Sequence, residues 1–236
     1  MKFPGKLVEG RLIRRYKRFL ADVQLADGVV TAACPNTGSM MGCCDAGNRV
    51  WLSESDRATR KYRHTWELVE VGRVMVGINT GRPNALVAEA IAGGVIAELA
   101  GYESVRREVR YGEESSRVDL VLESPERDAC YVEVKNVTAA ASRGVALFPD
   151  AVSERGARHL RELMRLKAQG LRPVQLYCVQ RGDVHEVRPA DGIDHEYGRT
   201  LRDAIAAGVE VLAYRAKVTP REIKLAERIP VVCPDR

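Results

Sequence analysis

Alternating hydrophobic and polar positions dominate the first third of the chain. Apolar residues recur there at every second position, which is the period of a strand with one buried face. Gly, Asp, Pro and Asn interrupt the alternation, and these residues are typical of turns. The pattern predicts about five short strands, which suit a small, partly open, OB-like β-barrel of the class that often binds single strands or oligosaccharides. The five runs span residues 6–16, 19–26, 29–34, 49–55 and 65–78.

The pattern changes after residue 80, where helical and strand periods mix. Residues 79–84 read NTGRPN, a turn-rich boundary with Pro where a helix can begin. From there we expect an α/β domain with a mixed sheet flanked by helices. We therefore divide the chain into residues 1–80 and residues 81–236. The elements predicted in the second part span residues 84–100, 103–111, 117–122, 131–138, 153–169, 173–180, 197–207 and 209–215.

Two neighbouring strands of the second part form a candidate hairpin, RVDLVLESPERDACYVEVKNVT. Both strands alternate with period two, so each has a core face and a polar face, and Asp119, Glu133 and Lys135 fall on the polar faces. Residues 124–128 form a turn-rich connector. A hairpin centred on Glu126 places Asp119 opposite Glu133, with Lys135 one pleat further along. The sequence therefore predicts two carboxylates within reach of one cation.

These three side chains suit metal-dependent phosphodiester chemistry. Hard cations such as Mg²⁺, and Mn²⁺ in its place, prefer carboxylate oxygens, so Asp119 and Glu133 are candidate metal ligands. A bound metal activates water and stabilises charge on phosphate, while Lys135 adds a positive charge or positions the attacking water. The alternative is an ordinary charged hairpin face that is exposed to solvent.

Positive charge is concentrated in the first part of the chain. The formal net charge is +5; residues 1–80 hold 13 Lys and Arg against 8 Asp and Glu, and the remainder holds 24 of each. A basic leading domain favours a polyanion as partner, although the excess also serves solubility. With only 6% aromatic residues, we expect phosphate contacts more than base stacking. The candidate DNA-binding residues of this part are Arg14, Arg15, Lys17, Arg18, Arg60 and Lys61.

Two further candidate groups lie on predicted helices. Glu89 stands in an apolar stretch, where a carboxylate is costly unless it is paired or metal-bound, so it is a candidate third catalytic carboxylate; Glu98 competes for that role. Arg155 and His159 are four residues apart and share one helix face. Arg155 could bind a phosphate there, and His159 could position or exchange a proton. The alternative is that both residues belong to a helix face exposed to solvent.

Other features narrow the class of protein. The six cysteines have no C-x-x-C spacing and are expected to be free thiols of a reducing compartment. The start of the chain does not resemble a signal peptide, and no apolar stretch is long enough to span a bilayer, so we expect a cytoplasmic protein without a membrane partner. No nucleophile elbow, Walker loop or dinucleotide fingerprint is present.

The element order after residue 84 resembles the PD-(D/E)xK nuclease-like fold, which keeps its metal site on the second and third strands. Val118 stands where that motif has Pro. The whole chain resembles the sugar fermentation stimulation protein A family. The strings that carry this resemblance are PNTGSM at 35–40, TRKYRHTWELVEV at 59–71, NTGRPN at 79–84, RVDLVL at 117–122, YVEVKNVT at 131–138 and FPDAVSERGARHLREL at 148–163.

The resemblance implies an N-terminal OB-like barrel, a C-terminal nuclease-like domain, DNA binding and a link to sugar metabolism. In nuclease-like folds an acidic residue of the first helix often completes the metal site, which is the role implied for Glu89. We expect a DNA-binding protein with a Mg²⁺-dependent nuclease site, and leave a homodimer open. The alternatives are a DNA-binding regulator that does not cut and an oligosaccharide-binding module; excess positive charge favours nucleic acid over neutral sugar.

Overall fold

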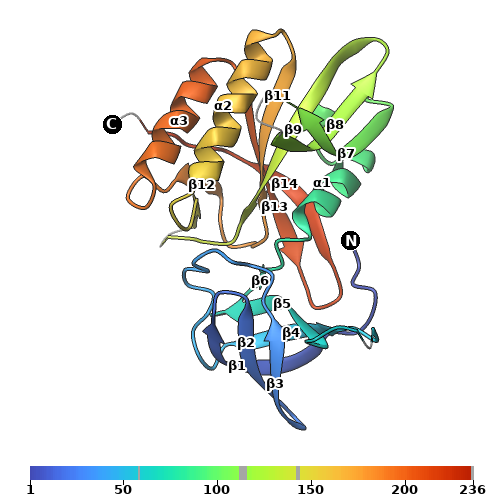
Figure 1. Ribbon diagram of the computed structural model, residues 1–236, viewed down its shortest axis with the longest axis vertical. Helices are drawn as coiled ribbons and strands as arrows, with labels where there is room; N and C mark the ends of the chain where they lie inside the picture. The colour runs from blue at the N-terminus through green and yellow to red at the C-terminus, as the bar shows by residue number, and fades with distance from the viewer. Residues whose placement is uncertain (58, 112–115, 142–143, 235–236) are drawn as a thin grey trace.

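The first domain is a small barrel of short strands, seen in the lower half of Figure 1. The computed structural model describes residues 1–57, 59–111, 116–141 and 144–234. The strand order is β3-β2-β1-β4-β5-β6, and β3 also pairs with β5, which closes the barrel. The predicted OB-like barrel is thus confirmed. Its strands are β1 (Val8–Tyr16), β2 (Leu20–Leu25), β3 (Gly28–Ala33), β4 (Arg49–Glu54), β5 (His64–Val71) and β6 (Val74–Gly77).

One predicted strand of the barrel, residues 65–78, is a hairpin of two. Gly72 has φ +61°, a left-handed conformation that favours glycine and lets the chain reverse between β5 and β6. Inside the barrel, alternate residues of the strands pack around the fully buried Trp66. The barrel core therefore arises from the period-two pattern, as expected.

The second domain contains a mixed six-stranded sheet with order β14-β13-β11-β9-β8-β7. The three central strands β9, β11 and β13 are parallel, and the outer pairs are antiparallel. The predicted mixed sheet flanked by helices is confirmed. The strands are β7 (Ser104–Tyr111), β8 (Ser116–Ser124), β9 (Arg127–Val137), β11 (Arg172–Val179), β13 (Glu210–Val218) and β14 (Ile223–Ile229); β10 (Val145–Phe148) and β12 (Glu186–Pro189) form a separate parallel pair.

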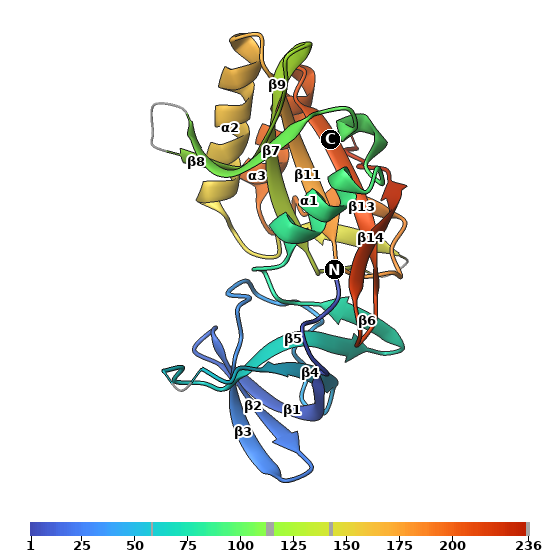
Figure 2. The same cartoon turned by 90° about the vertical axis from the view of Figure 1, so that its right-hand side faces the viewer.

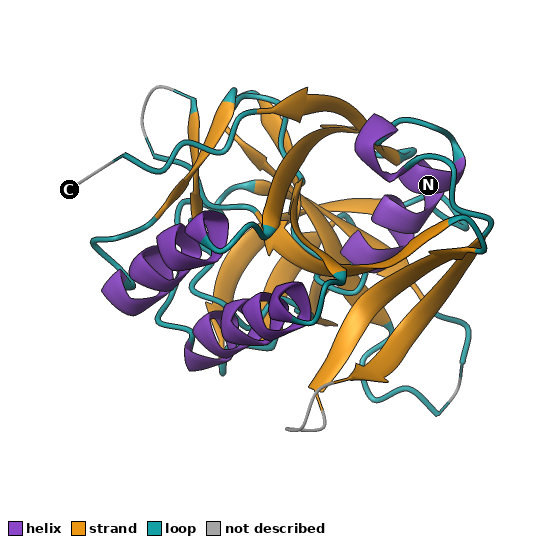
Figure 3. Cartoon of the chain, turned by 90° about the horizontal axis from the view of Figure 1, so that it is seen from above, coloured by secondary structure: helices purple, strands orange, loops and turns teal. Residues whose placement is uncertain are grey.

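Helices cover both faces of this sheet, as Figures 2 and 3 show. One face packs on α1 (Pro83–Ala92), and the other packs on α2 (Glu154–Ala168) and α3 (His195–Ala206). The polar face predicted for the hairpin is therefore not a solvated one. It also carries Val121 and Val137, which are buried under α2, so any charge on this face must be paired or put to use.

The predicted helix 84–100 is wrong in its second half. The helix ends at Ala92, Gly94 adopts φ +69°, and only a short 3-10 turn follows at Ala97–Leu99. Two consecutive glycines lower helix propensity and permit this reversal. Strands β10, β12 and β14 were not predicted, because their apolar residues form no long alternating run.

The two domains contact each other through backbone as well as side chains. The amide of Gly77 donates to the carbonyl of Gln180 over 2.8 Å, and Val76 forms a bridge with Arg181. The first residues of the chain also reach the second domain, where Lys2 pairs with Glu222. In the part of the chain that the structure describes, no helix is both long and apolar enough to cross a membrane.

Candidate active site

The predicted hairpin forms with the predicted centre. Strand β8 pairs with β9 through Leu120↔Val132, Val121↔Tyr131 and Leu122↔Cys130, a register that puts Asp119 level with Glu133. The ladder of strand pairs stops at Leu120. Beyond it the side chain of Asp119 takes over, and its Oδ2 accepts a hydrogen bond of 2.7 Å from the amide of Val134. The two strands therefore separate at the carboxylates, which opens room between them.

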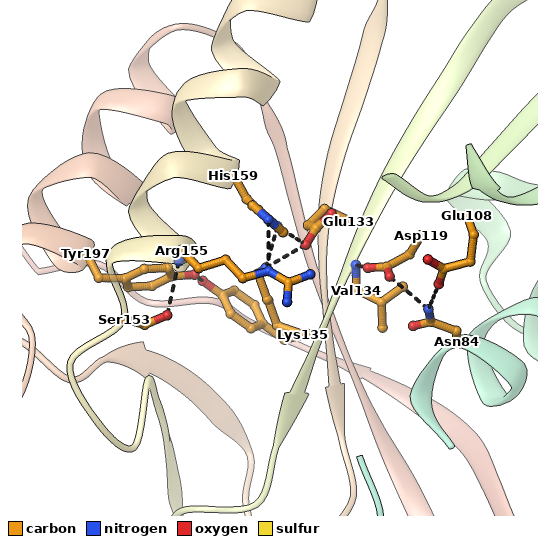
Figure 4. A network of polar contacts seen from close by, with 12 residues as sticks. Asn84, Glu108, Asp119, Glu133, Val134, Lys135, Ser153, Arg155, His159 and Tyr197 are labelled. Carbon is orange, nitrogen blue, oxygen red and sulfur yellow. Dashed lines mark hydrogen bonds and ion pairs between the residues drawn. The ribbon is translucent and has the colours of Figure 1, made fainter. Parts of the chain in front are cut away.

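On the side of the site nearest α1, the side-chain amide of Asn84 binds the Asp119 carboxylate. Asn84, in the first turn of α1, donates from Nδ2 to Asp119 Oδ1 over 2.8 Å and to Glu108 Oε1 over 3.3 Å (Figure 4). Glu108 has φ +53°, a conformation that is unusual for a residue with a side chain and tends to occur at functional sites. A second carboxylate thus lies beside Asp119 through a shared amide partner.

On the side nearest α2, Lys135 and His159 contact the carboxylate of Glu133. Glu133 is 3% exposed, and its Oε1 accepts a hydrogen bond of 2.6 Å from Lys135 Nζ. The same oxygen contacts Nδ1 of His159, which lies 3.1 Å from Lys135 Nζ. The other oxygen of Glu133, Oε2, is buried and has no partner among the described residues. Glu133 therefore keeps one oxygen available for a further ligand.

Helix α2 carries His159 into this contact. Its N-cap Ser153 accepts from the amide of Gly156 over 3.0 Å and donates its own amide to Asp194 over 2.7 Å, so the start of α2 is tied to the cap of α3. A Cβ at Gly156 would lie 3.0 Å from the ring of Tyr197. The absence of a side chain at Gly156 therefore lets α2 pack closely against Tyr197 of α3.

Arg155 contacts the second ring nitrogen of His159. Its Nε donates to His159 Nε2 over 3.2 Å, and an arginine Nε–H can only donate. The other ring nitrogen, Nδ1, lies between two groups: Lys135 Nζ, which can only donate, and the carboxylate oxygen Glu133 Oε1. Arg155, His159 and Glu133 thus form a continuous chain of polar contacts that ends at a carboxylate.

The surroundings move the pKa values of the two carboxylates in opposite directions. Burial, together with the nearby charge of Glu133, raises the pKa of Asp119 from 3.8 to about 6. Burial would also raise the pKa of Glu133, but Lys135 and His159 more than offset it, and that pKa lies below its usual value. Such a divergence is typical of functional sites.

A buried glutamine lies next to Glu133 on the neighbouring strand. Gln175 pairs with Glu133 in the parallel register of β9 and β11, so the two side chains point to the same face of the sheet. Gln175 is 0% exposed, and no described residue is a hydrogen-bond partner of its amide nitrogen or its amide oxygen. Buried polar groups are rarely left unpaired, and exceptions commonly mark a ligand or water position.

These residues fit a hard divalent cation, although they do not by themselves form a complete cage. Glu133 Oε2 is an unpartnered buried carboxylate oxygen, and Asp119 is an adjacent carboxylate whose raised pKa reflects burial and the charge of Glu133. Among the described residues, no group of three or more His, Cys, Asp or Glu side chains is arranged to hold a metal. A cation with few protein ligands and several waters is the pattern usual for Mg²⁺.

Comparison with known proteins identifies the family. Residues 81–222 match the model of the sugar fermentation stimulation protein RE domain, and residues 13–78 match that of the SfsA N-terminal OB domain. The chain belongs to the sugar fermentation stimulation protein family. It is 61% identical over 230 residues to the homolog from Thioalkalivibrio sulfidiphilus, covering 97% of this chain and 96% of that one. It is 60% identical over 233 residues to the homolog from Geobacter metallireducens, covering 98% and 100%.

A solved structure of the same family has the same fold. The structure of Pyrococcus furiosus SfsA in complex with Ca²⁺ superposes with a TM-score of 0.89 at 26% identity and covers 98% of both chains. The OB-like barrel and the nuclease-like domain of this chain are therefore both shared with a family member.

The structure does not bring Glu89 to the site. Its carboxylate contacts the N-terminal amine of Met1 over 2.7 Å, and its side chain is 51% exposed. Glu98, the competing candidate, contacts Arg228 over 2.9 Å at the far end of the same segment. The α1 residue that contacts Asp119 is Asn84, in the first turn of the helix.

Asn84, Glu108 and Gln175 are the site residues that the sequence reasoning missed. Asn84 closes the NTGRPN string that marked the domain boundary, which was a usable signal. Glu108 lies opposite Asp119 in the register of β7 and β8, which follows once those two strands are paired. Gln175 interrupts the near-continuous apolar run PVQLYCVQ, and a polar residue in a fully buried strand is itself a signal.

The basic residues predicted to bind DNA differ in their surroundings. Arg14 pairs with Asp22 over 2.8 Å. Arg15 is directed inward and donates to several backbone carbonyls, including Asn36 and Gly38, over 2.9 and 2.7 Å, so it supports a loop. Lys17 is exposed. The remaining three, Arg18, Arg60 and Lys61, are also exposed.

Proposed function

We propose that this protein binds DNA and hydrolyses its phosphodiester bonds with Mg²⁺ or Mn²⁺ held by Asp119 and Glu133. The observation that carries the proposal is the environment of Glu133. Lys135 and His159 contact one oxygen of this buried carboxylate, its second oxygen has no partner in the described part of the chain, and its charge is close enough to Asp119 to raise the pKa of that carboxyl. A structural ion pair would be expected to satisfy both oxygens.

The side chains around the carboxylates have roles that follow from their contacts. A bound divalent cation would supply Lewis-acid stabilisation of phosphate charge and acidify a water. Lys135, 12% exposed at its side chain, is placed to present its ammonium to a phosphate oxygen or to the attacking water. Arg155 is exposed and hydrogen-bonded to His159, so it can contact a phosphate from the solvent side of α2.

The comparisons support the proposal in two ways. The family model that covers residues 81–222 is described as an RE domain, and the pyrococcal relative is described in complex with Ca²⁺. Ca²⁺ and Mg²⁺ are both hard cations that prefer oxygen ligands. Binding by the barrel draws support from its exposed basic residues, of which Lys17 and Arg18 lie at the β1–β2 turn.

A DNA-binding regulator that does not cut is the second candidate. It is favoured by one observation, that no three metal-ligating side chains of the described residues are arranged around one point. In that case the contacts of Lys135 and His159 with Glu133 would be a structural network under α2.

Cleavage assays with matched variants separate the two candidates. Linear, circular and single-stranded DNA are incubated with purified protein in Mg²⁺, Mn²⁺ or EDTA. We expect cation-dependent cleavage by the wild type and a loss of about 100-fold or more for Glu133→Gln. Lys135→Ala should lose cleavage but keep the rise in melting temperature that the cation produces, because its role is with phosphate and water.

The two readouts also show which part of the proposal fails. No cleavage under any condition, with the cation still raising the melting temperature of the wild type but not of Glu133→Gln, would leave a metal site without hydrolysis. An equal thermal response of wild type and Glu133→Gln to the cation would exclude the metal site and favour the regulator.

A further inference from the structure

A pocket of about 350 Å³ lies where the two domains meet. The barrel side contributes Arg18, Asn36 and Thr37, and the second domain contributes Asn136 and Ser153. We call it the interdomain pocket. Small-molecule sites in proteins have volumes of about 300 to 1,000 Å³, so the interdomain pocket has room for a ligand of moderate size.

The interdomain pocket adjoins the candidate active site through two elements. Asn136 directly follows Lys135 on β9. Ser153 is the N-cap of α2 and precedes Arg155 by two residues. A ligand in the pocket therefore lies near the N-terminal turn of α2, which carries Arg155, whereas the side chain of Lys135 points to the opposite face of β9 from that of Asn136.

The barrel wall of the pocket is preorganised. Arg18 donates from Nε to the carbonyl of Thr37 over 3.0 Å. At the next turn of this loop, the amide of Met40 donates to Asp150 Oδ2 in the second domain over 2.9 Å. A Cβ at Gly38 would lie 2.7 Å from Asp150 Oδ1, so glycine permits this close approach. A loop that is held before binding loses little entropy when a ligand arrives.

Exposed apolar side chains lie at the pocket and next to it in the sequence. Val152 lines the pocket and is 73% exposed, and Phe19, which is 51% exposed, directly follows the lining residue Arg18 in the β1–β2 turn. An exposed phenylalanine next to an exposed arginine is the combination that stacks a base and contacts its phosphate. The uncharged polar groups of Asn36, Thr37 and Asn136 in the pocket suit the edges of a base or a sugar.

We propose that the interdomain pocket receives one unpaired nucleotide of a DNA or RNA strand, with Phe19 and Val152 against the base and Arg18 near its phosphate. The strand that reaches Glu133 and Lys135 is then single at this point, so the substrate class is single-stranded nucleic acid, or the unpaired end of a duplex. A base inside a double helix is stacked and paired, so it presents neither a face nor an edge to the pocket unless it is extruded. The step from binding to cleavage rests on the proposed function.

Binding measured without cleavage tests the inference. Labelled oligonucleotides of one sequence are titrated in EDTA by fluorescence anisotropy as single-stranded DNA, single-stranded RNA, blunt duplex and duplex with an unpaired end. We expect tighter binding of the single strands and of the duplex with an unpaired end than of the blunt duplex. Whether DNA or RNA binds more tightly shows which of the two supplies the nucleotide.

Variants at exposed positions test the pocket without disturbing the fold. Phe19→Ala should weaken single-strand binding by about 5- to 100-fold, the usual range for one stacked base. Val152→Glu should weaken it more than Val152→Gln, because only the former adds a negative charge to the surface that receives a polyanionic strand. Val29→Ala at the β2–β3 turn, where Val29 is 59% exposed, should leave binding unchanged.

Tighter binding of the blunt duplex, or single-strand affinity unaltered by both Phe19→Ala and Val152→Glu, would overturn the inference whatever the cleavage assays show. Single-strand preference that depends on Phe19, in a protein that never cleaves, would support the interdomain pocket and count only against the proposed hydrolysis.

Discussion

The two carboxylates of the hairpin are level with each other on neighbouring strands, yet their surroundings differ in kind. Asp119 is held by uncharged donors, the amide of Val134 and the side chain of Asn84. Glu133 is held by Lys135 and His159. Consequently the pKa of Asp119 is raised to about 6, mainly by burial, while that of Glu133 lies below its usual value.

The difference arises from the helices rather than from the hairpin. The first turn of α1 supplies an amide to one carboxylate, and α2 supplies His159 to the other (Figure 4). A symmetrical pair in the sequence thus becomes one carboxylate that is easily protonated and one that stays ionised. Without a cation, this arrangement lowers the repulsion between two buried negative charges.

The largest effect is expected for Asp119→Asn in the absence of metal. A carboxyl whose folded pKa is raised binds its proton more tightly in the folded protein, so it lowers stability as pH rises from about 4 to about 6, and this loss persists above. Removing the charge should raise the free energy of unfolding at about pH 8 by up to roughly 3 kcal/mol, and by much less at about pH 4. Urea unfolding in EDTA at both pH values measures the change.

Asp183→Asn provides a comparison of opposite sign. Asp183 is paired with the buried Arg181 over 2.7 Å, and the hydrogen bond from Arg181 lowers its pKa. Ionised Asp183 contributes to the free energy of unfolding above the pKa that it has in the unfolded chain, and this contribution is lost as pH falls. Asp183→Asn should therefore be less stable than the wild type at about pH 8. Destabilisation of both variants at that pH would show that Asp119 is already neutralised in the metal-free protein.

An intermediate effect is expected for Gln175→Leu. Neither amide atom of Gln175 has a partner among the described residues, so an apolar side chain of similar size should stabilise the metal-free protein by about 1 to 3 kcal/mol. Gln180→Leu is the matched control, because Gln180 is equally buried but donates to Asn136 over 2.6 Å. The control should be destabilised by about 1 kcal/mol in urea unfolding.

Equal destabilisation of the two glutamine variants would have a specific meaning. Gln175 would then have a partner that is not a protein atom, and the space between Gln175 and Glu133 would hold a bound water. That result would mean that a bound water contacts Glu133 in addition to Lys135 and His159.

The sequence was sufficient for the features that depend on periodicity. Alternation predicted the barrel and the hairpin register, and that register alone placed Asp119 level with Glu133. The four-residue spacing of Arg155 and His159 predicted that they share a helix face, and the structure directs His159 to Glu133. Both are local rules, a period of 2 for strands and about 3.6 for helices.

Features that depend on how elements pack were not available from the sequence. Which turn of α1 reaches β8 is set by the crossing of a helix over a sheet, so Glu89 and Asn84 could not be ranked by pattern. Gln175 lies in a strand buried on both faces, where alternation carries no information about which face a residue occupies. The positive φ of Glu108 likewise follows from tertiary contacts.

The smallest effect is expected for Glu89→Gln, which is the matched control for Glu133→Gln. Glu89 is half exposed and, among the residues that the structure describes, pairs with the N-terminal amine, so the variant should change the free energy of unfolding by less than about 1 kcal/mol. That small change should shrink further at high salt, because exposed ion pairs are screened. Cleavage and the cation-induced rise in melting temperature should match the wild type. If Glu89→Gln lost the cation-induced rise in melting temperature, α1 would contribute a carboxylate to the metal site. The site would then hold a third carboxylate besides Asp119, which amide groups contact, and Glu133, which Lys135 and His159 contact.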